Sequence, residues 1–424
     1  MDLLIKNAAI INPGGAHHGD TRDVLIREGI IAAIETSISA AELPILEGEQ
    51  LQVSIGWMDL GTQVGDPGYE HRESLETAAA AAASGGFTAI ASQPNTAPAI
   101  HSKSEVLYLK NNTRGQLVGF YPIAAISRDC AGKALTEMID LHQAGAVAFS
   151  DGKKAIQSSG LMLRALQYVK AFGGLVINQP LDADIAGEGL MHEGFTSTSL
   201  GLRGIPAIAE EVMVQRDLHL LEYTGSRLHL AGLSTAGAVE MVRQAKARGL
   251  RVTASVAVLN LAFDDSALEG FDVNFKVLPP LRSRADREAL QAGLLDGTID
   301  AICSNHLPLE EELKKVEFPY ASFGATGLET MYALCHTRLG EWLSDDLFVE
   351  KAAIGPRRAL GLPLPQLEVG QAADLTVFSP AQPWVYQPEQ GYSRSHNSPL
   401  SGQAFQGRPL AAISRNQSFI QRDR

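Results

Sequence analysis

Cysteine is scarce in this sequence, and the few cysteines lie far apart. The 424 residues include three, Cys130, Cys303 and Cys335. That is too few and too scattered for a disulfide framework or for a zinc site built from thiolates. Such usage is typical of a reducing compartment.

Long apolar runs and an excess of positive charge are also missing. No run approaches the roughly 18 apolar residues of a membrane span, and the opening segment MDLLIKNAAIINPGG does not have the pattern of a leader peptide. Lysine and arginine number 35 against 48 aspartates and glutamates, a formal net charge of −13. Nucleic acids and anionic membranes require clustered cations, so neither is expected as a partner, and the expected location is the cytoplasm.

What the sequence does contain is a repeating strand and helix pattern. Hydrophobic residues make up 45% of the chain, enough to bury a large core. Apolar runs such as FTAIAS, GLVINQ and RVTASV alternate with alanine-rich helical stretches and glycine turns. The alternation over residues 53–360 predicts an α/β fold with a parallel sheet, and its length favours a (β/α)₈ barrel of the TIM type. A doubly wound open sheet is the structural alternative.

The two ends of the chain share a different pattern. LLIKNAAII and DVLIREGIIAAI near the start, and ADLTVFS and AAISRNQSFIQ near the end, are short alternating runs separated by turn residues. Such runs predict small antiparallel strands. We therefore expect one small β-sandwich domain assembled from residues 1–52 and 361–424.

Several longer motifs resemble the type I dihydroorotases of the amidohydrolase superfamily. They are GWMDLGTQVGDPGYEHRES, ASQPNTAP, GAVAFSDG, RLHLAGLSTAGAVEMVRQAKARG, FKVLPPLRSRADREALQAGLLDGTIDAICSNHLP and ASFGATGLET. The resemblance spans most of the chain and implies the barrel and sandwich described above. It also implies a zinc site at the barrel mouth that activates water for opening or closing a cyclic amide.

The positions at which the resemblance places the metal ligands and the general base carry other residues. They are Gly61, Gln63, Gln179, Gly232 and Asn305. The positions that would contact substrate are also changed, to Gly65 in place of a carboxylate-binding arginine, Leu278 and Leu309. Asp59, Asn95, Asp151 and His306 are retained.

These replacements bear directly on zinc chemistry. Zinc requires three or four anionic or imidazole ligands, whereas glycine offers none and carboxamides are weak neutral donors. A carboxamide at position 305 cannot titrate and so cannot act as a general base. The expectation is a pseudoenzyme with no metal and no cofactor. His229 is expected to point away from the mouth, toward the helix layer, because it lies three residues before Gly232.

The resemblance extends to noncatalytic dihydroorotase homologues that are subunits of aspartate carbamoyltransferase, such as those of pseudomonads. It implies a structural subunit that assembles with the carbamoyltransferase catalytic chains in a hetero-oligomer for pyrimidine biosynthesis, with self-association a further possibility. One alternative is an amidohydrolase-fold enzyme for a cyclic amide or ureide with a rearranged metal site on Asp59, Asp151 and His306. Another is a small-molecule sensor that uses the barrel mouth.

Overall fold

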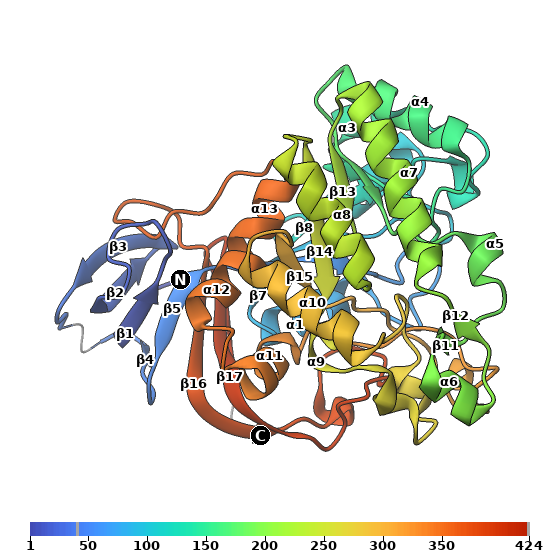
Figure 1. The fold of residues 1–424 in the computed structure, drawn as a ribbon. Helices are drawn as coiled ribbons and strands as arrows, with labels where there is room; N and C mark the ends of the chain where they lie inside the picture. Colours follow the sequence, from blue (N-terminus) through green and yellow to red (C-terminus); the bar gives the residue numbers. More distant parts are fainter. Residues whose placement is uncertain (40–41, 422–424) are drawn as a thin grey trace.

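The computed structural model describes residues 1–39 and 42–421. Its centre is a parallel sheet that curls into a nearly closed barrel (Figure 1), with the strand order β15-β14-β13-β10-β9-β8-β7-β6. The strands are β6 (Trp57–Thr62), β7 (Phe87–Ser92), β8 (Gly119–Ala124), β9 (Ala148–Phe149), β10 (Val176–Asn178), β13 (Leu228–Leu230), β14 (Val252–Ala257) and β15 (Ala301–Cys303). The predicted barrel is confirmed, and the open sheet is excluded because β15 also contacts β6.

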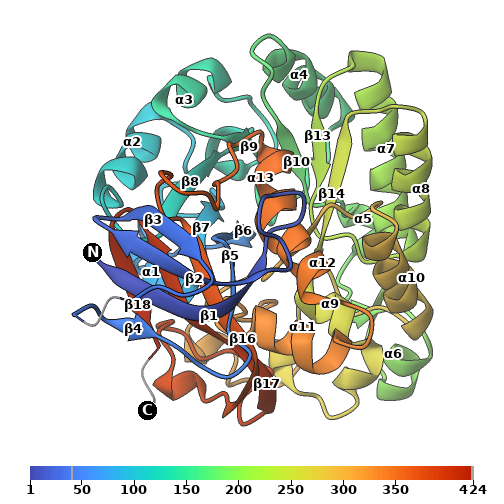
Figure 2. The ribbon, with the colours of Figure 1, turned by 90° about the vertical axis from the view of Figure 1, so that its left-hand side faces the viewer.

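Helices surround this sheet (Figure 2), as the strand and helix alternation predicts. The helices between and after the barrel strands are α1 (Leu75–Ser84), α2 (Lys103–Asn112), α3 (Met138–Ala144), α4 (Ser159–Lys170), α7 (Ile208–Thr224), α8 (Ala236–Ala247), α10 (Arg284–Leu295), α11 (Met331–Leu339), α12 (Asp345–Val349) and α13 (Gly355–Leu360). Shorter elements lie in the loops: α5 (Ala183–Ala186), β11 (Met191–His192), α6 (Phe195–Leu200), β12 (Gly204–Ile205) and α9 (Val258–Ala262). None of the helices in the described part of the chain has the length and apolar composition that a membrane crossing requires.

Strands from both ends of the chain form a second sheet beside the barrel (Figures 1 and 2). Its order is β18-β17-β16-β5-β1-β2-β3, with β4 paired to β1. The strands are β1 (Leu3–Ile11), β2 (Thr21–Arg27), β3 (Ile30–Glu35), β4 (Ile45–Leu46), β5 (Gln52–Ile55), β16 (Leu375–Val385), β17 (Ala404–Ser414) and β18 (Gln417–Ile420). The expected strand-rich unit from both termini is confirmed, whereas the boundaries after residues 52 and 360 stay predictions.

Two apolar clusters fill the barrel and its outer layer. Met58, Leu60 and Ile177 belong to a cluster drawn almost entirely from barrel strands, which is the barrel interior. Trp57, Ile90 and Val176, each next to members of that cluster in the chain, belong instead to the large cluster shared with the helices. This alternation is the two-residue period of a strand covered on both faces, and it fixes which side chains reach the barrel axis.

Candidate functional site

A cavity of about 350 Å³ lies at the carboxyl ends of three neighbouring barrel strands, β8, β9 and β10. Its lining comes from the segments that follow β8, β9 and β10 and from Leu278: Cys130, Ala131, Gly132, Asp151, Lys153, Lys154, Ala155, Gln157, Gln179, Leu181, Ala183 and Leu278. Active sites of (β/α)₈ enzymes lie at this end of the barrel. Gln179 and Leu278, two positions that the resemblance assigns to the site, line this cavity.

Asp59 joins the two strands at which the barrel closes. Its Oδ1 accepts a hydrogen bond from the backbone N–H of Ser304, 2.7 Å away and just after β15. Its Oδ2 accepts from the N–H of Gly61 and the hydroxyl of Thr62. The carboxylate is fully buried, so its retention is explained by barrel closure.

Asp151 and Asn95 stabilise the turn that follows β9. Asp151 accepts hydrogen bonds from the backbone N–H of Ser127, at 2.9 Å, and from the Ser127 hydroxyl. Burial raises the pKa of Asp151, which the hydrogen bonds from Ser127 oppose. The Asn95 amide donates to the carbonyl of Asp151 at 2.9 Å and accepts from the N–H of Lys153 at 3.0 Å.

His306 is fully buried, and both of its ring nitrogens have partners. Nδ1 accepts from the N–H of Gly327 at 3.2 Å, so Nε2 carries the proton that it donates to Glu73 Oε2 at 3.3 Å. Glu73 also accepts from the hydroxyl of Ser393 and the N–H of Arg394. The pair attaches the C-terminal segment to the barrel and offers no free nitrogen to a ligand.

The rearranged metal site on Asp59, Asp151 and His306 is therefore not formed, because each group is directed to its own structural partners. No group of three or more His, Cys, Asp and Glu side chains that could hold a metal ion occurs in residues 1–39 and 42–421. The zinc that the family implies does not fit the residues present either. The ligand positions hold glutamine, asparagine and glycine. The ammonium group of Lys153 lies against the asparagine, Asn305.

The glycines at the altered positions differ in the space around them. A Cβ on Gly61 would meet nothing closer than Cys303 at 3.5 Å, which is ordinary contact. A Cβ on Gly65 would lie 2.1 Å from the carbonyl oxygen of Tyr69 and 2.6 Å from that of Glu73. Gly232 has a φ of +67°, a backbone conformation that disfavours a histidine.

A chain of side-chain hydrogen bonds crosses the mouth between the altered positions. The Gln63 amide donates to the carbonyl of Asn95 at 3.0 Å, and Asn95 in turn holds the backbone of Lys153. The Lys153 Nζ donates to Asn305 Oδ1, and the Asn305 amide donates to the carbonyl of Leu278 at 3.2 Å. Gln63 Oε1 is buried and has no hydrogen-bond partner in the described part of the chain.

Lys153 is the site residue that sequence reasoning missed. Its amine donates to the carboxamide oxygen of Asn305. Burial lowers the pKa of Lys153, although the nearby Cys303 and Asp59 oppose this. Its position directly after a barrel strand was the available signal, because charged residues at the carboxyl ends of barrel strands are often functional.

The orientation of His229 differs from expectation in an informative way. His229 pairs in register with Ile177, so it faces the barrel interior and not the helix layer. The prediction was wrong because β13 ends at Leu230, and strand alternation does not extend to Gly232. Burial lowers the pKa of His229 to about 3, and the ring is held by Thr253 and Ser255. Leu309 is buried under the C-terminal segment.

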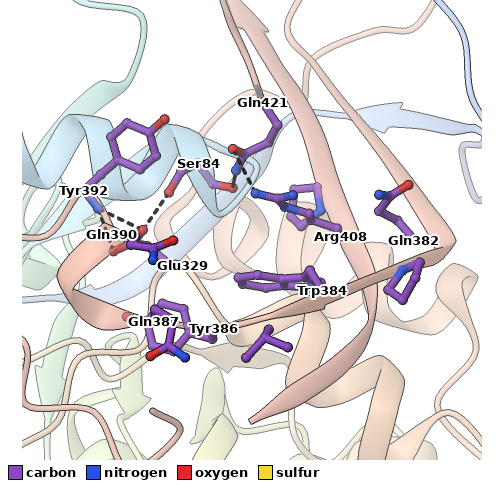
Figure 3. Close-up of a pocket in the computed structure, with 14 residues that line it drawn as sticks. Ser84, Glu329, Gln382, Trp384, Tyr386, Gln387, Gln390, Tyr392, Arg408 and Gln421 are labelled. Atoms are coloured by element: carbon purple, nitrogen blue, oxygen red, sulfur yellow. Dashed lines mark hydrogen bonds between the residues drawn. The ribbon is translucent and has the colours of Figure 1, made fainter. Parts of the chain in front are cut away.

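A second cavity, of about 430 Å³, lies away from the mouth, between the β16–β17 hairpin and the end of α1 (Figure 3). The Arg408 guanidinium lies over the Trp384 ring, 5.0 Å from its centroid. Glu329 accepts hydrogen bonds from the N–H groups of Tyr392 and Ser393. The first contact lies within the hairpin, whereas those of Glu329 attach the segment that follows β16 to the barrel domain. No position of the predicted site lies in this cavity.

Solved structures of other proteins share the fold of this chain. L-hydantoinase (dihydropyrimidinase) from Arthrobacter aurescens superposes with a TM-score of 0.86 at 24% identity, covering 99% of this chain and 96% of its own. Dihydropyrimidinase from Brevibacillus agri gives 0.84 at 19% identity, covering 99% and 95%. At these identities the likeness shows the fold alone, which is the barrel and terminal sheet of the amidohydrolases.

The sequence relatives are closer. The model of the family described as dihydro-orotase-like matches residues 52–238. A dihydroorotase of Pelotomaculum thermopropionicum is 43% identical over 97% of both chains. A dihydroorotase of Syntrophus aciditrophicus is 40% identical over the whole length of both chains. The chain belongs to the dihydroorotase family.

This membership corrects one expectation. The sequence analysis predicted that the chain is not an enzyme, from the loss of zinc ligands and general base. Relatives that are about 40% identical over their full lengths are named dihydroorotase, and they support an enzyme. The prediction was wrong because it equated the loss of one metal site with the loss of all activity.

Proposed function

We propose that this chain serves pyrimidine biosynthesis in the cytoplasm, as a dihydroorotase-family enzyme for a cyclic amide or ureide of the dihydroorotate class. The observation that carries the proposal is the cavity at the barrel mouth. Its volume of about 350 Å³ lies in the range of small-molecule sites. Its lining combines lysines and carboxamides, which are donors for carbonyl and carboxylate oxygens.

The test is a dihydroorotase assay on untagged protein in both directions, namely ring opening of dihydroorotate and ring closure of N-carbamoyl-aspartate. We expect turnover that neither added zinc nor a chelator changes, because the residues at the mouth do not fit a zinc ion. Lack of turnover in both directions, with and without zinc, would refute the catalytic part of the proposal.

We also propose that the chain assembles with the catalytic chains of aspartate carbamoyltransferase in a hetero-oligomer. Its resemblance to dihydroorotase homologues that are subunits of that transferase supports this. So do exposed aromatic side chains of the kind enriched at interfaces, Phe195 at 89% and Tyr320 at 78% exposure.

Co-expression with the transferase from the same organism, followed by size-exclusion chromatography with light scattering, tests the assembly. We expect one complex that contains both chains. A chain that elutes alone, beside a transferase that is fully assembled and active without it, would refute this part.

A further inference from the structure

Lys153 is a cationic side chain at the barrel mouth with unused hydrogen-bonding capacity. An ammonium group has three N–H donors. In the described part of the chain its Nζ has one acceptor, Asn305 Oδ1. Because the Asn305 amide is itself fixed by the carbonyl of Leu278, the direction of the Lys153 amine is set, and its other donors remain for a ligand in the cavity that Lys153 lines.

The two carboxylates near Lys153, those of Asp151 and Asp59, are hydrogen-bonded to other groups. Both oxygens of Asp151 accept hydrogen bonds from Ser127. Both oxygens of Asp59 accept from groups on β6 and after β15. Neither carboxylate forms an ion pair with Lys153 among the described residues. The cavity lining carries two lysines and one aspartate in a chain whose net charge is −13, and this local excess of positive charge favours an anionic ligand.

The family resemblance implies an arginine at position 65 that binds the carboxylate of the ligand, and this chain cannot hold one there. Position 65 is glycine, and any side chain there would collide with the carbonyl oxygens of Tyr69 and Glu73. The remaining cations of the cavity lining are Lys153 and Lys154. Lys154 is exposed, whereas Lys153 is half-buried, and a charge shielded from solvent binds an anion more strongly.

We propose that Lys153, oriented by Asn305, binds the carboxylate of a cyclic amide acid at the barrel mouth. The inference rests on the proposed function, since it names the group that selects the substrate class of that site. Lys153 is a specificity-determining residue in this account: it separates a carboxylate-bearing ring from the same ring without the carboxylate.

Calorimetric titration of the full chain with two probes tests the inference. The probes are dihydroorotate and dihydrouracil, which is the same ring without the carboxylate. A charge-assisted hydrogen bond predicts that the wild type binds dihydroorotate about 10- to 100-fold more tightly. We expect Lys153→Met to lose this preference, Lys153→Arg to keep part of it, and Lys133→Met, a matched control at an exposed lysine outside the cavity lining, to keep it. Thermal unfolding of each variant reports whether it folds.

The outcomes separate the two proposals. Wild-type protein that binds neither probe overturns the proposed function, and the role of Lys153 with it. Wild-type protein that binds both probes equally, or a folded Lys153→Met variant that retains the preference, overturns the role of Lys153 alone. The wild-type comparison needs no variant, so it can overturn the role of Lys153 even if Lys153→Met does not fold, and Lys153→Arg then serves as the variant that tests the attribution.

Discussion

Gly65 gives the sharpest structural prediction, because its surroundings leave no room for a side chain. A Cβ at this position would lie 2.1 Å from the carbonyl oxygen of Tyr69 and 2.6 Å from that of Glu73, both well inside the 3.0 Å that real Cβ atoms respect. Gly61 lies four residues earlier in the chain, and its nearest neighbour would be Cys303 at 3.5 Å. The pair Gly65→Ala and Gly61→Ala therefore applies one chemical change to two different environments.

The expected cost follows from the backbone that would have to move. Gly65 donates to Glu73 at 3.0 Å and accepts from the N–H of Tyr69 at 2.6 Å, so relief of the collision disturbs a hydrogen-bonded turn. Overpacking typically costs 1–3 kcal/mol, and a weakened hydrogen bond about 1 more. The lower unfolded-state entropy of alanine returns about 0.4–1 kcal/mol. We expect Gly65→Ala to lower the free energy of unfolding by about 1–3 kcal/mol.

Gly61→Ala has no such collision, so we expect its effect to lie within about 0.5 kcal/mol of zero. Urea unfolding followed by fluorescence measures both, with Trp57, fully buried between the two sheets, as a reporter. The urea concentrations at the unfolding midpoints are compared, provided that the free energy of unfolding falls with urea at the same slope in both variants. The reasoning fails if Gly65→Ala is no less stable than Gly61→Ala.

The remaining predictions concern metal content and pH. Elemental analysis of untagged protein should give well below one zinc per chain, and stoichiometric zinc would contradict the account of the ligand positions. Burial and the neighbouring Lys276 lower the pKa of Lys314 to about 7, so the unfolded chain binds more protons between pH 7 and 10. The free energy of unfolding should therefore rise with pH there by up to about 1.4 kcal/mol per unit, and Lys314→Met should flatten the rise. Burial raises the pKa of Glu73, but hydrogen bonds from His306 and Ser393 outweigh it and leave the pKa below its usual value. Its stabilisation should be present above pH 4.5 and be lost as the pH falls. Glu73→Gln should cost about 1–3 kcal/mol at pH 7 and less at pH 3 in urea unfolding, and an equal cost at both would show that the charge has no role.

Much of the fold could be predicted because the barrel strands are short apolar runs with turn residues at both ends. FTAIAS is β7 in full, and LLIKNAAII is β1. The strand β8 was not recognised, because Pro122 lies within it and proline is unusual inside a sheet. The elements α5, β11, α6 and β12 were not predicted, since each has two to six residues and depends on contacts with distant segments such as Leu268 and Phe318.

The site was predicted unevenly for a related reason. A resemblance transfers positions, and two of the positions that it assigns to the site, Gln179 and Leu278, line one cavity. It does not transfer side-chain direction, which local packing decides. His306 remains in the sequence but points to Glu73, and Lys153 belongs to no family motif yet points to Asn305. Only the structure distinguishes a retained residue that supports the barrel, such as His306, from one that lines the cavity, such as Lys153.

The altered positions also depend on one another. Asn305 has a φ of +52°, which asparagine tolerates better than most residues, and its carboxamide accepts from Lys153 while it donates to Leu278. An aspartate at 305 would keep the acceptor and lose the donor, and it would form an ion pair with the same amine. A zinc ion placed among these groups would meet a like charge at Lys153. The residues at the mouth therefore suit one another: the ligand positions hold glycines and carboxamides, and the ammonium group of Lys153 is directed at Asn305. Histidines restored at positions 61 and 63 alone would not rebuild a zinc site while Lys153 remains.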